Sequence, residues 1–137
     1  MKRKNFRFLE HTADIKFKAY GKTLNEAFEN VILAVSDYLG KGNNIEAVKR
    51  KKIKVEGDDE KSLLYNFVDE LIYLVDAERF IVSGGKVKIK DGKLEGELWG
   101  DDVKNYKGLD HIKAATYAEM EIKKEKKGWM IQCVVDV

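Results

Sequence analysis

Residues 14–42 read DIKFKAYGKTLNEAFENVILAVSDYLGKG and combine a strand signal with a helix signal that follows it at once. Apolar and polar residues alternate from Ile15 to Ala19, which is the period of a half-buried strand. Thr23 and Glu26 then form a capping-box pattern, which predicts that a helix begins here. The helical face ends at a pair of glycines and consists of Leu24, Ala27, Phe28, Val31, Val35 and Leu39. The stretch predicts a strand that turns directly into an amphipathic helix.

On either side of this stretch the same patterns recur. Phe6 and Phe8 are two positions apart and predict a short first strand, and Lys49–Glu56 alternates around Ile53 and Val55. Asp58 or Asp59 can cap a second helix. Its apolar positions are spaced to cover a sheet, and they are Leu63, Leu64, Phe67, Val68, Leu71, Leu74 and Val75.

The second half of the chain is rich in strand signals. Lys86–Lys90 and Leu94–Trp99 flank Asp91-Gly92, a dipeptide that suits the positive φ values of a tight hairpin turn. Before them, Ser83-Gly84-Gly85 predicts a turn after Phe80-Ile81-Val82. Thr116–Ile122 and Trp129–Val135 predict a second hairpin, and Gly100–Asp110 predicts a surface loop.

The order is strand, strand, helix, strand, helix, and then several strands. Helices and strands do not alternate as a doubly wound parallel sheet requires, so we predict an α+β fold. Two amphipathic helices are expected to pack on a largely antiparallel or mixed sheet. Residues 1–137 should form a single domain, because a second core needs roughly 50 residues or more of its own.

Composition excludes several classes of protein. The chain is 44% hydrophobic, and 26 Lys and Arg against 24 Asp and Glu leave a net charge of +2. This is far from the positive field of a dedicated nucleic-acid-binding domain, so direct RNA binding is disfavoured. The sequence shows no signal peptide and no apolar run of membrane-spanning length, and a cytoplasmic location is expected. A lone cysteine, Cys133, excludes an intrachain disulfide.

Signals for catalysis are weak. Ser83-Gly84-Gly85 lacks the Lys-Ser/Thr ending of a P-loop, and no Gly-x-Ser-x-Gly elbow is present. Cys133 lies in an alternating strand, where a buried small hydrophobe is favoured over a reactive thiol. The basic run Lys49–Lys52 can touch phosphate, although a solvated strand face or a protected sheet edge is favoured.

Two carboxylates stand apart from the other acids. Asp14 lies between two predicted strands, and Asp136 ends the last one. From spacing alone, Asp14 can be a turn residue that accepts hydrogen bonds from nearby amides, and Asp136 can belong to a frayed terminus. On spacing alone, these two structural roles are favoured over a functional one.

Four separated motifs resemble the archease family, in order and over nearly the whole chain. They are His11-Thr12-Ala13-Asp14-Ile15, the segment from Asp58-Asp59-Glu60 through Leu63-Leu64-Tyr65-Asn66-Phe67 to Asp69-Glu70, Ile112-Lys113-Ala114-Ala115-Thr116-Tyr117, and Gly128-Trp129 with Val134-Val135-Asp136-Val137. The resemblance implies a small α+β protein that is not an enzyme. It implies a protein cofactor of the RtcB-type RNA ligase in tRNA splicing and RNA repair, which promotes guanylylation of the ligase's active-site histidine and multiple turnover.

The resemblance also implies a divalent ion, taken as calcium, held by Asp14, Asp136 and Val137. His11, Lys113, Thr116 and Tyr117 are implied as contacts with the partner, with RNA reached only through the ligase complex and no membrane involved. The basic segment is a further possible ligase contact. The chain departs from the family at Ala118, where a histidine is common. This departure puts in doubt any role carried by that side chain.

Two other functions stay open at the level of sequence. The first is a general chaperone or modulator of RNA-modifying enzymes, which the family has also been thought to be. The second is a metal-dependent phosphohydrolase that uses Asp14 and Asp136. A hydrolase needs a general base near the metal, and His11 is the only histidine close in sequence to either acid.

Overall fold

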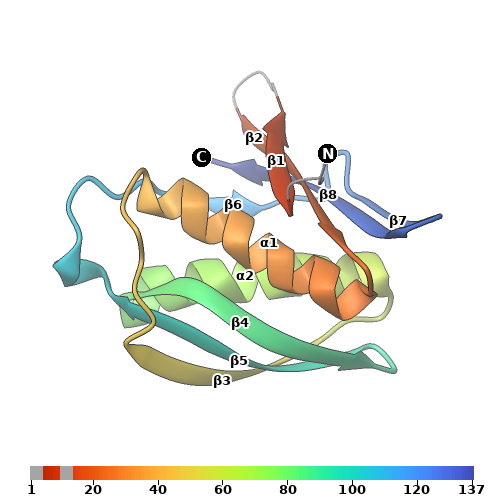
Figure 1. The fold of residues 1–137 in the computed structure, drawn as a ribbon, viewed down its shortest axis with the longest axis horizontal. Coiled ribbons are helices and arrows are strands. Elements are labelled where there is room, and N and C mark those ends of the chain that lie inside the picture. The colour runs from red at the N-terminus through yellow and green to blue at the C-terminus, as the bar shows by residue number, and fades with distance from the viewer. Residues whose placement is uncertain (1–4, 10–13) are drawn as a thin grey trace.

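The computed structural model describes residues 5–9 and 14–137, which form two antiparallel sheets with two helices between them (Figure 1). The predicted α+β class is confirmed, but the strands divide between two sheets instead of one. In chain order the elements are β1 (Phe6–Leu9), β2 (Asp14–Gly21), α1 (Leu24–Gly40), β3 (Lys49–Glu56), α2 (Glu60–Glu78), β4 (Phe80–Lys90), β5 (Lys93–Asp102), the 3-10 helix η1 (Val103–Asn105), β6 (Ala114–Ala115), β7 (Glu121–Glu125) and β8 (Gly128–Asp136).

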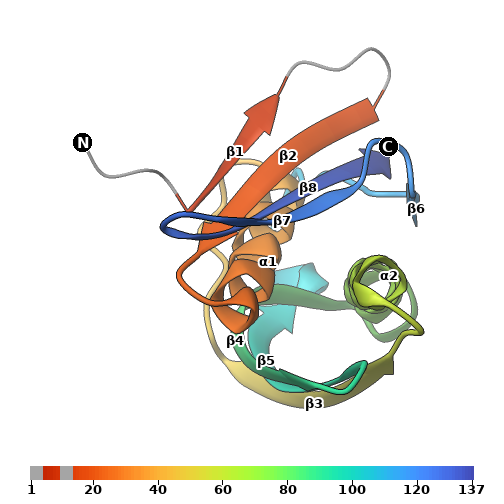
Figure 2. The same cartoon turned by 90° about the vertical axis from the view of Figure 1, so that its right-hand side faces the viewer.

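The first sheet joins the beginning and the end of the described chain. Its strand order is β1-β2-β8-β6, and β7 pairs with the early part of β8. The second sheet has the order β3-β5-β4. Figure 2 shows α1 and α2 between the two sheets. Each sheet therefore has an inner face on the helices and an outer face that points away from them.

The predicted start of α1 is confirmed in detail. The Thr23 hydroxyl oxygen accepts the Glu26 N–H at 3.1 Å, and the Glu26 carboxylate accepts the N–H of Lys22 at 3.3 Å. The capping box therefore reaches one residue further back than the pattern predicts. The helix ends at Gly40, and Lys41 provides the left-handed cap with φ of 43°.

The start of α2 is also confirmed, with Asp59 as the cap. Its carboxylate accepts the Ser62 N–H at 2.7 Å, and this hydrogen bond holds the Asp59 pKa below its ordinary value. Phe67 on this helix meets Phe28 on α1 at 5.5 Å between ring centroids, and both side chains are fully buried. The two helices therefore pack against each other through these rings in the centre of the core. Neither α1 nor α2 has the length and hydropathy that a membrane crossing requires.

One edge of the second sheet is closed by side chains of α1. The Val87 N–H donates to Glu29 Oε2 at 3.0 Å, and the Ile89 N–H donates to Asn25 Oδ1 at 3.1 Å. These amides lie on the edge of β4 that faces away from β5. Helix α1 thus satisfies donors that an open sheet edge would expose, which fixes the sheet against the helix.

The turn predicted at Ser83-Gly84-Gly85 is wrong. These residues lie inside the continuous strand β4, whose register with β5 shifts between Val82 and Gly84. A Cβ atom at Gly84 would lie 2.7 Å from Nε1 of Trp99, so the indole occupies the space that a side chain would take. The glycines therefore mark a β-bulge with a close approach, not a chain reversal.

The second predicted hairpin is only partly right. β7 and β8 form it, but β7 begins at Glu121, and the residues from Thr116 to Met120 are not in a strand. The Thr116 hydroxyl donates to the Val134 carbonyl at 2.6 Å, and the Gln132 amide donates to the Glu119 carbonyl at 2.7 Å. Side chains thus replace backbone pairing between β6 and β7. The predicted loop begins later than expected, because β5 continues to Asp102.

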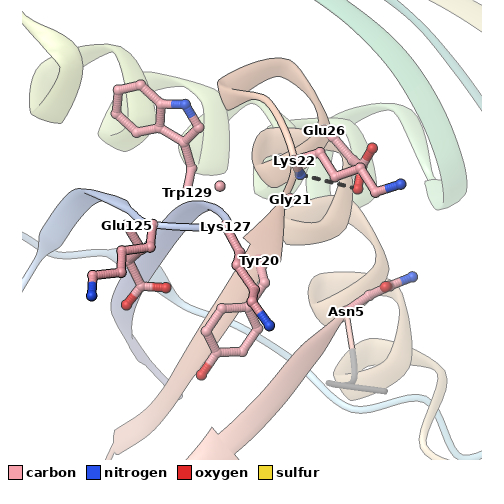
Figure 3. Close-up of a pocket in the computed structure, with 10 residues that line it drawn as sticks. Asn5, Tyr20, Gly21, Lys22, Glu26, Glu125, Lys127 and Trp129 are labelled. Atoms are coloured by element: carbon pink, nitrogen blue, oxygen red, sulfur yellow. Dashed lines mark hydrogen bonds between the residues drawn. The ribbon is translucent and has the colours of Figure 1, made fainter. Parts of the chain in front are cut away.

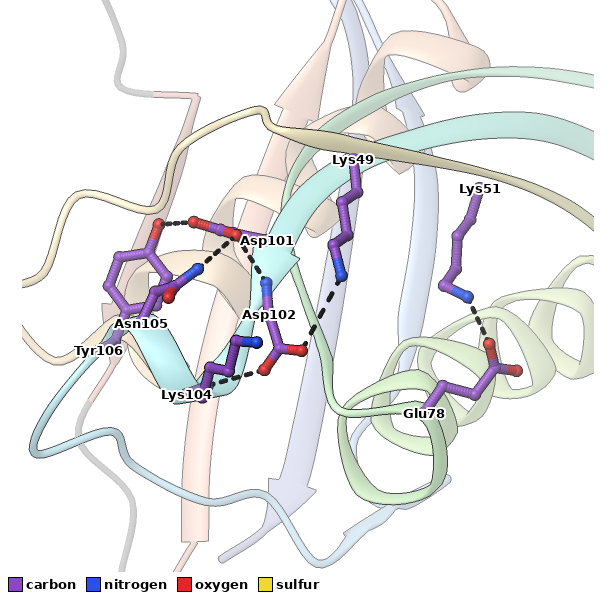
Figure 4. Close-up of polar contacts among 8 residues, drawn as sticks. All are labelled: Lys49, Lys51, Glu78, Asp101, Asp102, Lys104, Asn105 and Tyr106. Atoms are coloured by element: carbon purple, nitrogen blue, oxygen red, sulfur yellow. Dashed lines mark hydrogen bonds and ion pairs between the residues drawn. The ribbon is translucent and has the colours of Figure 1, made fainter.

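A buried carboxylate at the end of β5 accepts hydrogen bonds from the residues that follow this strand (Figure 4). Asp101, only 4% exposed, accepts hydrogen bonds from the Tyr106 hydroxyl at 2.8 Å and from Asn105 Nδ2 at 2.9 Å. The Tyr106 hydroxyl in turn accepts the Glu46 N–H at 2.9 Å. The network ties the loop to the connection between α1 and β3. The Tyr106 bond, with the Asp102 N–H and Asn105, lowers the Asp101 pKa.

We expect Asp101→Asn to destabilise the protein at neutral pH, because the amide group cannot accept all of these hydrogen bonds. A lowered folded-state pKa means that the carboxylate's contribution is complete above the ordinary value of about 3.9 and is lost as pH falls through the lower value. The stability gap between wild type and variant should therefore narrow below about pH 4. Urea unfolding from pH 7 to pH 2 measures it, and a constant gap would contradict this role.

Candidate functional site

The two singled-out carboxylates are cross-strand partners. Asp14 begins β2 and Asp136 ends β8, and the antiparallel register places them directly opposite each other. Residues in this relation have Cβ atoms about 4.5–5.5 Å apart, and their side chains share one face of the sheet. Ile15, the next residue on β2, pairs with Val135 and belongs to the inner, core-facing side. The acid pair therefore lies on the outer face, at one end of the strand pair.

The backbone of Asp136 is held from both sides. Besides its pairing with Asp14, it pairs with Ala114 on β6, and its carbonyl accepts the Lys113 N–H at 2.7 Å. Val137 follows directly and packs partly buried against the core. The expectation that Asp136 belongs to a frayed terminus is therefore wrong. The position is as firmly paired as the middle of a sheet.

Next to the acid pair, the outer face carries compensated charges. Lys16 lies two residues beyond Asp14, and its ammonium bonds Glu119 at 3.0 Å. Further along, Lys123 bonds Glu121 at 3.0 Å, and this contact, strengthened by nearby lysines, holds the Glu121 pKa below its ordinary value. The charges of these lysines are therefore already engaged by glutamates. Strand register places Asp14 and Asp136 opposite each other on this same face.

The donor set at this pair suits a hard divalent cation by type. Two carboxylates directly opposite each other repel, and a cation between them relieves that repulsion. Calcium takes six to eight oxygen ligands, so carbonyl groups such as that of Val137 and solvent would have to complete the shell. Within residues 5–9 and 14–137, no group of three or more His, Cys, Asp or Glu side chains is placed to bind a metal. The two carboxylates thus offer the type of oxygen ligand that such an ion prefers, and they supply part of its coordination shell.

Three of the predicted partner contacts lie in or next to β6. His11 lies outside the described residues. Lys113 precedes β6 with an exposed side chain, and the Thr116 hydroxyl is engaged by the Val134 carbonyl. Tyr117 is 54% exposed. Its ring stacks on Tyr65 of α2, with centroids 4.4 Å apart and planes at 10°. A contact role for these residues stays a prediction.

The stacking partner Tyr65 belongs to one of the four sequence motifs, but no site role was predicted for it. The sequence places Tyr65 on a helix and cannot show that Tyr117 lies opposite it. Ala118 is exposed, and its N–H donates to the Thr116 hydroxyl oxygen at 3.2 Å. The segment between β6 and β7 thus presents the exposed Tyr117 ring, which is held by the half-buried Tyr65 of α2.

A separate hollow of about 650 Å³ lies at the other end of the β2–β8 pair (Figure 3). It lies between the turn after β2 and the turn between β7 and β8, and Tyr20, Lys22, Lys127 and Trp129 are among its lining residues. Seven residue steps separate Gly21 from Asp14 along β2, a distance of about 24 Å in an antiparallel strand. This hollow is therefore remote from the acid pair.

Cys133 is a core residue, as predicted. It is 2% exposed, and burial raises the pKa of its thiol to about 12. Because the thiolate is the reactive form, we expect no modification by a thiol reagent such as iodoacetamide at pH 8 in the folded protein. Complete modification should follow in guanidinium chloride. Rapid labelling of the native protein, followed by mass spectrometry, would contradict the buried, inert assignment.

Comparison with known proteins identifies the family. The model of the Archease protein family matches residues 6–137. "Protein archease" of Pyrococcus furiosus is 44% identical over 135 residues, covering 93% of this chain and 95% of the relative. "Protein archease" of Pyrobaculum calidifontis is 38% identical over 141 residues, covering 97% of this chain and 95% of the relative.

Solved structures agree with the fold. A solution structure of a Methanobacterium thermoautotrophicum protein superposes with a TM-score of 0.79 at 31% identity, covering 97% of this chain and 99% of that one. The crystal structure of an archease from Thermotoga maritima, described as a possible chaperone, has a TM-score of 0.61 at 16% identity. It covers 100% of this chain and 98% of its own. The family match over residues 6–137 and the agreement in fold lead to one conclusion: this chain belongs to the archease family.

Proposed function

We propose that this chain is a non-catalytic protein cofactor of an RtcB-type RNA ligase in tRNA splicing and RNA repair. It promotes guanylylation of the ligase's active-site histidine and so sustains multiple turnover. Membership of the archease family supports this proposal. The observation that carries it is the Asp14–Asp136 pair, because strand register fixes two acids opposite each other outside the buried core.

Asp14, Asp136 and Val137 would hold a divalent cation, which we take to be calcium. Such an ion would supply positive charge and would draw together the first residues of β2 and the last of β8. The chain's own groups keep this arrangement in place: the Lys113 N–H holds the Asp136 carbonyl, and Glu119 keeps the Lys16 ammonium. A cation would thus find the backbone of both acids already fixed by strand pairing, which reduces the ordering cost of binding.

The surface beside the pair supplies the contact with the ligase. Lys113 and the exposed Tyr117 ring lie on the segment that leads into and out of β6, next to Asp136. His11, in the segment before β2, and Thr116 complete the proposed contact set. Aromatic and cationic side chains of this kind are enriched where proteins bind each other. The ion and this segment together would form the docking end of the molecule.

The test is transfer of labelled guanylate from GTP to the purified ligase of the same host. We expect this chain, with calcium present, to raise the rate of covalent labelling at least tenfold, an effect of about 1.4 kcal/mol on the barrier. Chelation of divalent ions should remove the stimulation. An unchanged labelling rate at equimolar amounts would overturn the proposal.

A chaperone-like function is the second candidate, and the description of the Thermotoga maritima relative as a possible chaperone favours it. A holdase would suppress aggregation of unrelated proteins, whereas a ligase cofactor would not. Thermal aggregation of a tRNA methyltransferase and of an unrelated enzyme, followed by light scattering, separates the two. A metal-dependent phosphohydrolase, the third function, would release phosphate from simple phosphoesters when the protein is incubated alone with metal.

A further inference from the structure

The outer face of the β3-β5-β4 sheet is strongly basic, although the whole chain is nearly neutral. We call it the basic face. Ile53, Leu94 and Val87 are buried on the inner side, so the residues that alternate with them point outward. Seven cations share this face with three glutamates and one tryptophan: Arg50, Lys52, Lys54, Lys86, Lys88, Lys90 and Lys93, with Glu56, Glu95, Glu97 and Trp99.

Strand register arranges these charges in rows across the sheet. Lys52 and Lys86 flank Glu97 in one row, and Lys54 and Lys88 flank Glu95 in the next. Each row therefore keeps one positive charge in excess. Rows two residues apart are about 6.7 Å apart along the strands, a spacing comparable with that of successive phosphates in an extended single strand.

Within residues 5–9 and 14–137, few of these lysines form an ion pair. Arg50 bonds Glu97 at 2.7 Å, and Lys54 lies 3.9 Å from Glu95. Among the described parts of the chain, no ion pair involves Lys52, Lys86, Lys88, Lys90 or Lys93. The inward-facing lysines of β3 differ: Lys49 pairs with Asp102 at 3.9 Å and Lys51 with Glu78 at 2.5 Å (Figure 4). Within the β3-β5-β4 sheet, the lysines without an ion pair to a described acid therefore lie on the outer face.

An aromatic platform ends the same face. The Trp99 ring lies against Gly84, where a Cβ atom would come within 2.7 Å, and the Arg50 guanidinium lies 5.5 Å from the ring centroid. A guanidinium or indole plane of this kind can stack on an unpaired base. Beside it, an open hollow of about 610 Å³ is lined by side chains from all three strands, including Lys52, Lys54, Lys86 and Lys88.

We infer that the basic face binds single-stranded nucleic acid through its phosphate backbone. Lys52, Lys86 and Lys88 would contact phosphates from row to row, and the Arg50–Trp99 platform would receive a base. A paired duplex is a poorer fit, because its bases are stacked inside and cannot reach the platform. The inference departs from the expectation that RNA is reached only through the ligase, since net charge alone does not show how charge is distributed.

The basic face and the acid pair lie on opposite sides of the molecule. The β3-β5-β4 sheet lies on the far side of the helices from the sheet that carries Asp14 and Asp136 (Figure 1). A strand bound there would leave the carboxylate pair accessible to a protein. The inference does not rest on the proposed function, because the charges and the platform are present whatever the acid pair does.

The test measures fluorescence anisotropy of a labelled, unstructured RNA of roughly ten nucleotides, within the usual 4–16 nucleotide range of single-strand sites. Wild type should bind this RNA at low salt. The logarithm of its binding constant should fall linearly with the logarithm of the salt concentration, with a slope of about −0.7 for each phosphate contacted. The Lys52→Glu/Lys88→Glu double variant should bind roughly tenfold more weakly or worse, with a shallower slope. Both positions are solvent-exposed, so the fold should be retained, which circular dichroism checks.

The matched control is Lys124→Glu/Lys126→Glu, which changes the net charge equally at the exposed end of the other sheet. Its affinity for RNA should fall by less than about threefold, because this change weakens only the long-range electrostatic attraction. Equal losses in the two double variants would overturn the inference, and so would no binding of RNA by wild type at low salt. A duplex that binds as tightly as the single strand, or a polyglutamate peptide that displaces RNA at equal charge, would also overturn it.

Discussion

Asp14→Asn is expected to abolish both calcium-dependent stabilisation and stimulation of ligase guanylylation, while the protein stays folded. The change removes one charge with almost no change in shape, and Asp14 lies at the first position of β2, outside the buried core. Without divalent ions, the variant should still unfold in one cooperative transition, because Asp14 lies outside the buried core. With calcium at 100 times its Kd, wild type should gain about 2.7 kcal/mol, and the variant should gain little.

Thermal unfolding with calcium or with chelator, beside the guanylylation assay, measures both effects on one preparation. Asp91→Asn is a suitable control, since it removes one exposed carboxylate from the turn between β4 and β5 in the other sheet. It should retain calcium response and activity. If Asp14→Asn simply unfolds in every condition, the acid is a structural turn residue, and its assignment as an ion ligand is wrong.

Phe67→Ala should produce the largest loss of stability, about 3–5 kcal/mol, because it empties the contact between the two helices. The ring is fully buried and meets Phe28 at 5.5 Å. Since domains of this kind are stable by roughly 5–15 kcal/mol, the loss removes a large part of the total. Urea unfolding should show a lower midpoint with an unchanged slope.

The control for that change lies on the same helix. Tyr73 is 53% exposed, so Tyr73→Ala removes an aromatic ring from the surface of α2 and should alter stability by no more than about 0.5 kcal/mol. If Phe67→Ala and Tyr73→Ala lost similar amounts of unfolding free energy, the centre of the core would not lie between α1 and α2. Helix propensity affects both substitutions in the same direction and cannot produce the difference.

Local patterns in the sequence predicted the helices and the simple strands well. Thr23 and Asp59 cap the helices as expected, and β3 has the predicted bounds of Lys49–Glu56. These features depend on neighbours in the chain, and a capping side chain or a period of two is visible there. Division of the strands into two sheets was not predicted, because pairing partners are set by packing over the helices.

The errors have a common physical cause, which is contact between residues distant in sequence. Gly84 follows a turn-like pattern, but its role depends on Trp99, which fills the space above it. Thr116 follows a strand pattern, yet its hydroxyl replaces a backbone donor to Val134. The pairing of Asp14 with Asp136 was predictable as a possibility, whereas its secure hold by Lys113 and β6 was not. The basic face was hidden for the same reason, because β3 and β4 contribute separate halves of it.

The most direct test of the proposed function is the number of RNA joins made per ligase molecule. The host ligase is incubated with excess RNA ends and GTP, with this chain added at roughly one-tenth of the ligase concentration. Our account predicts that the ligase passes from about one join per molecule to many, and that chelation of calcium or Asp14→Asn returns it to one. A yield that stays at one join with wild-type protein and calcium present would contradict the account.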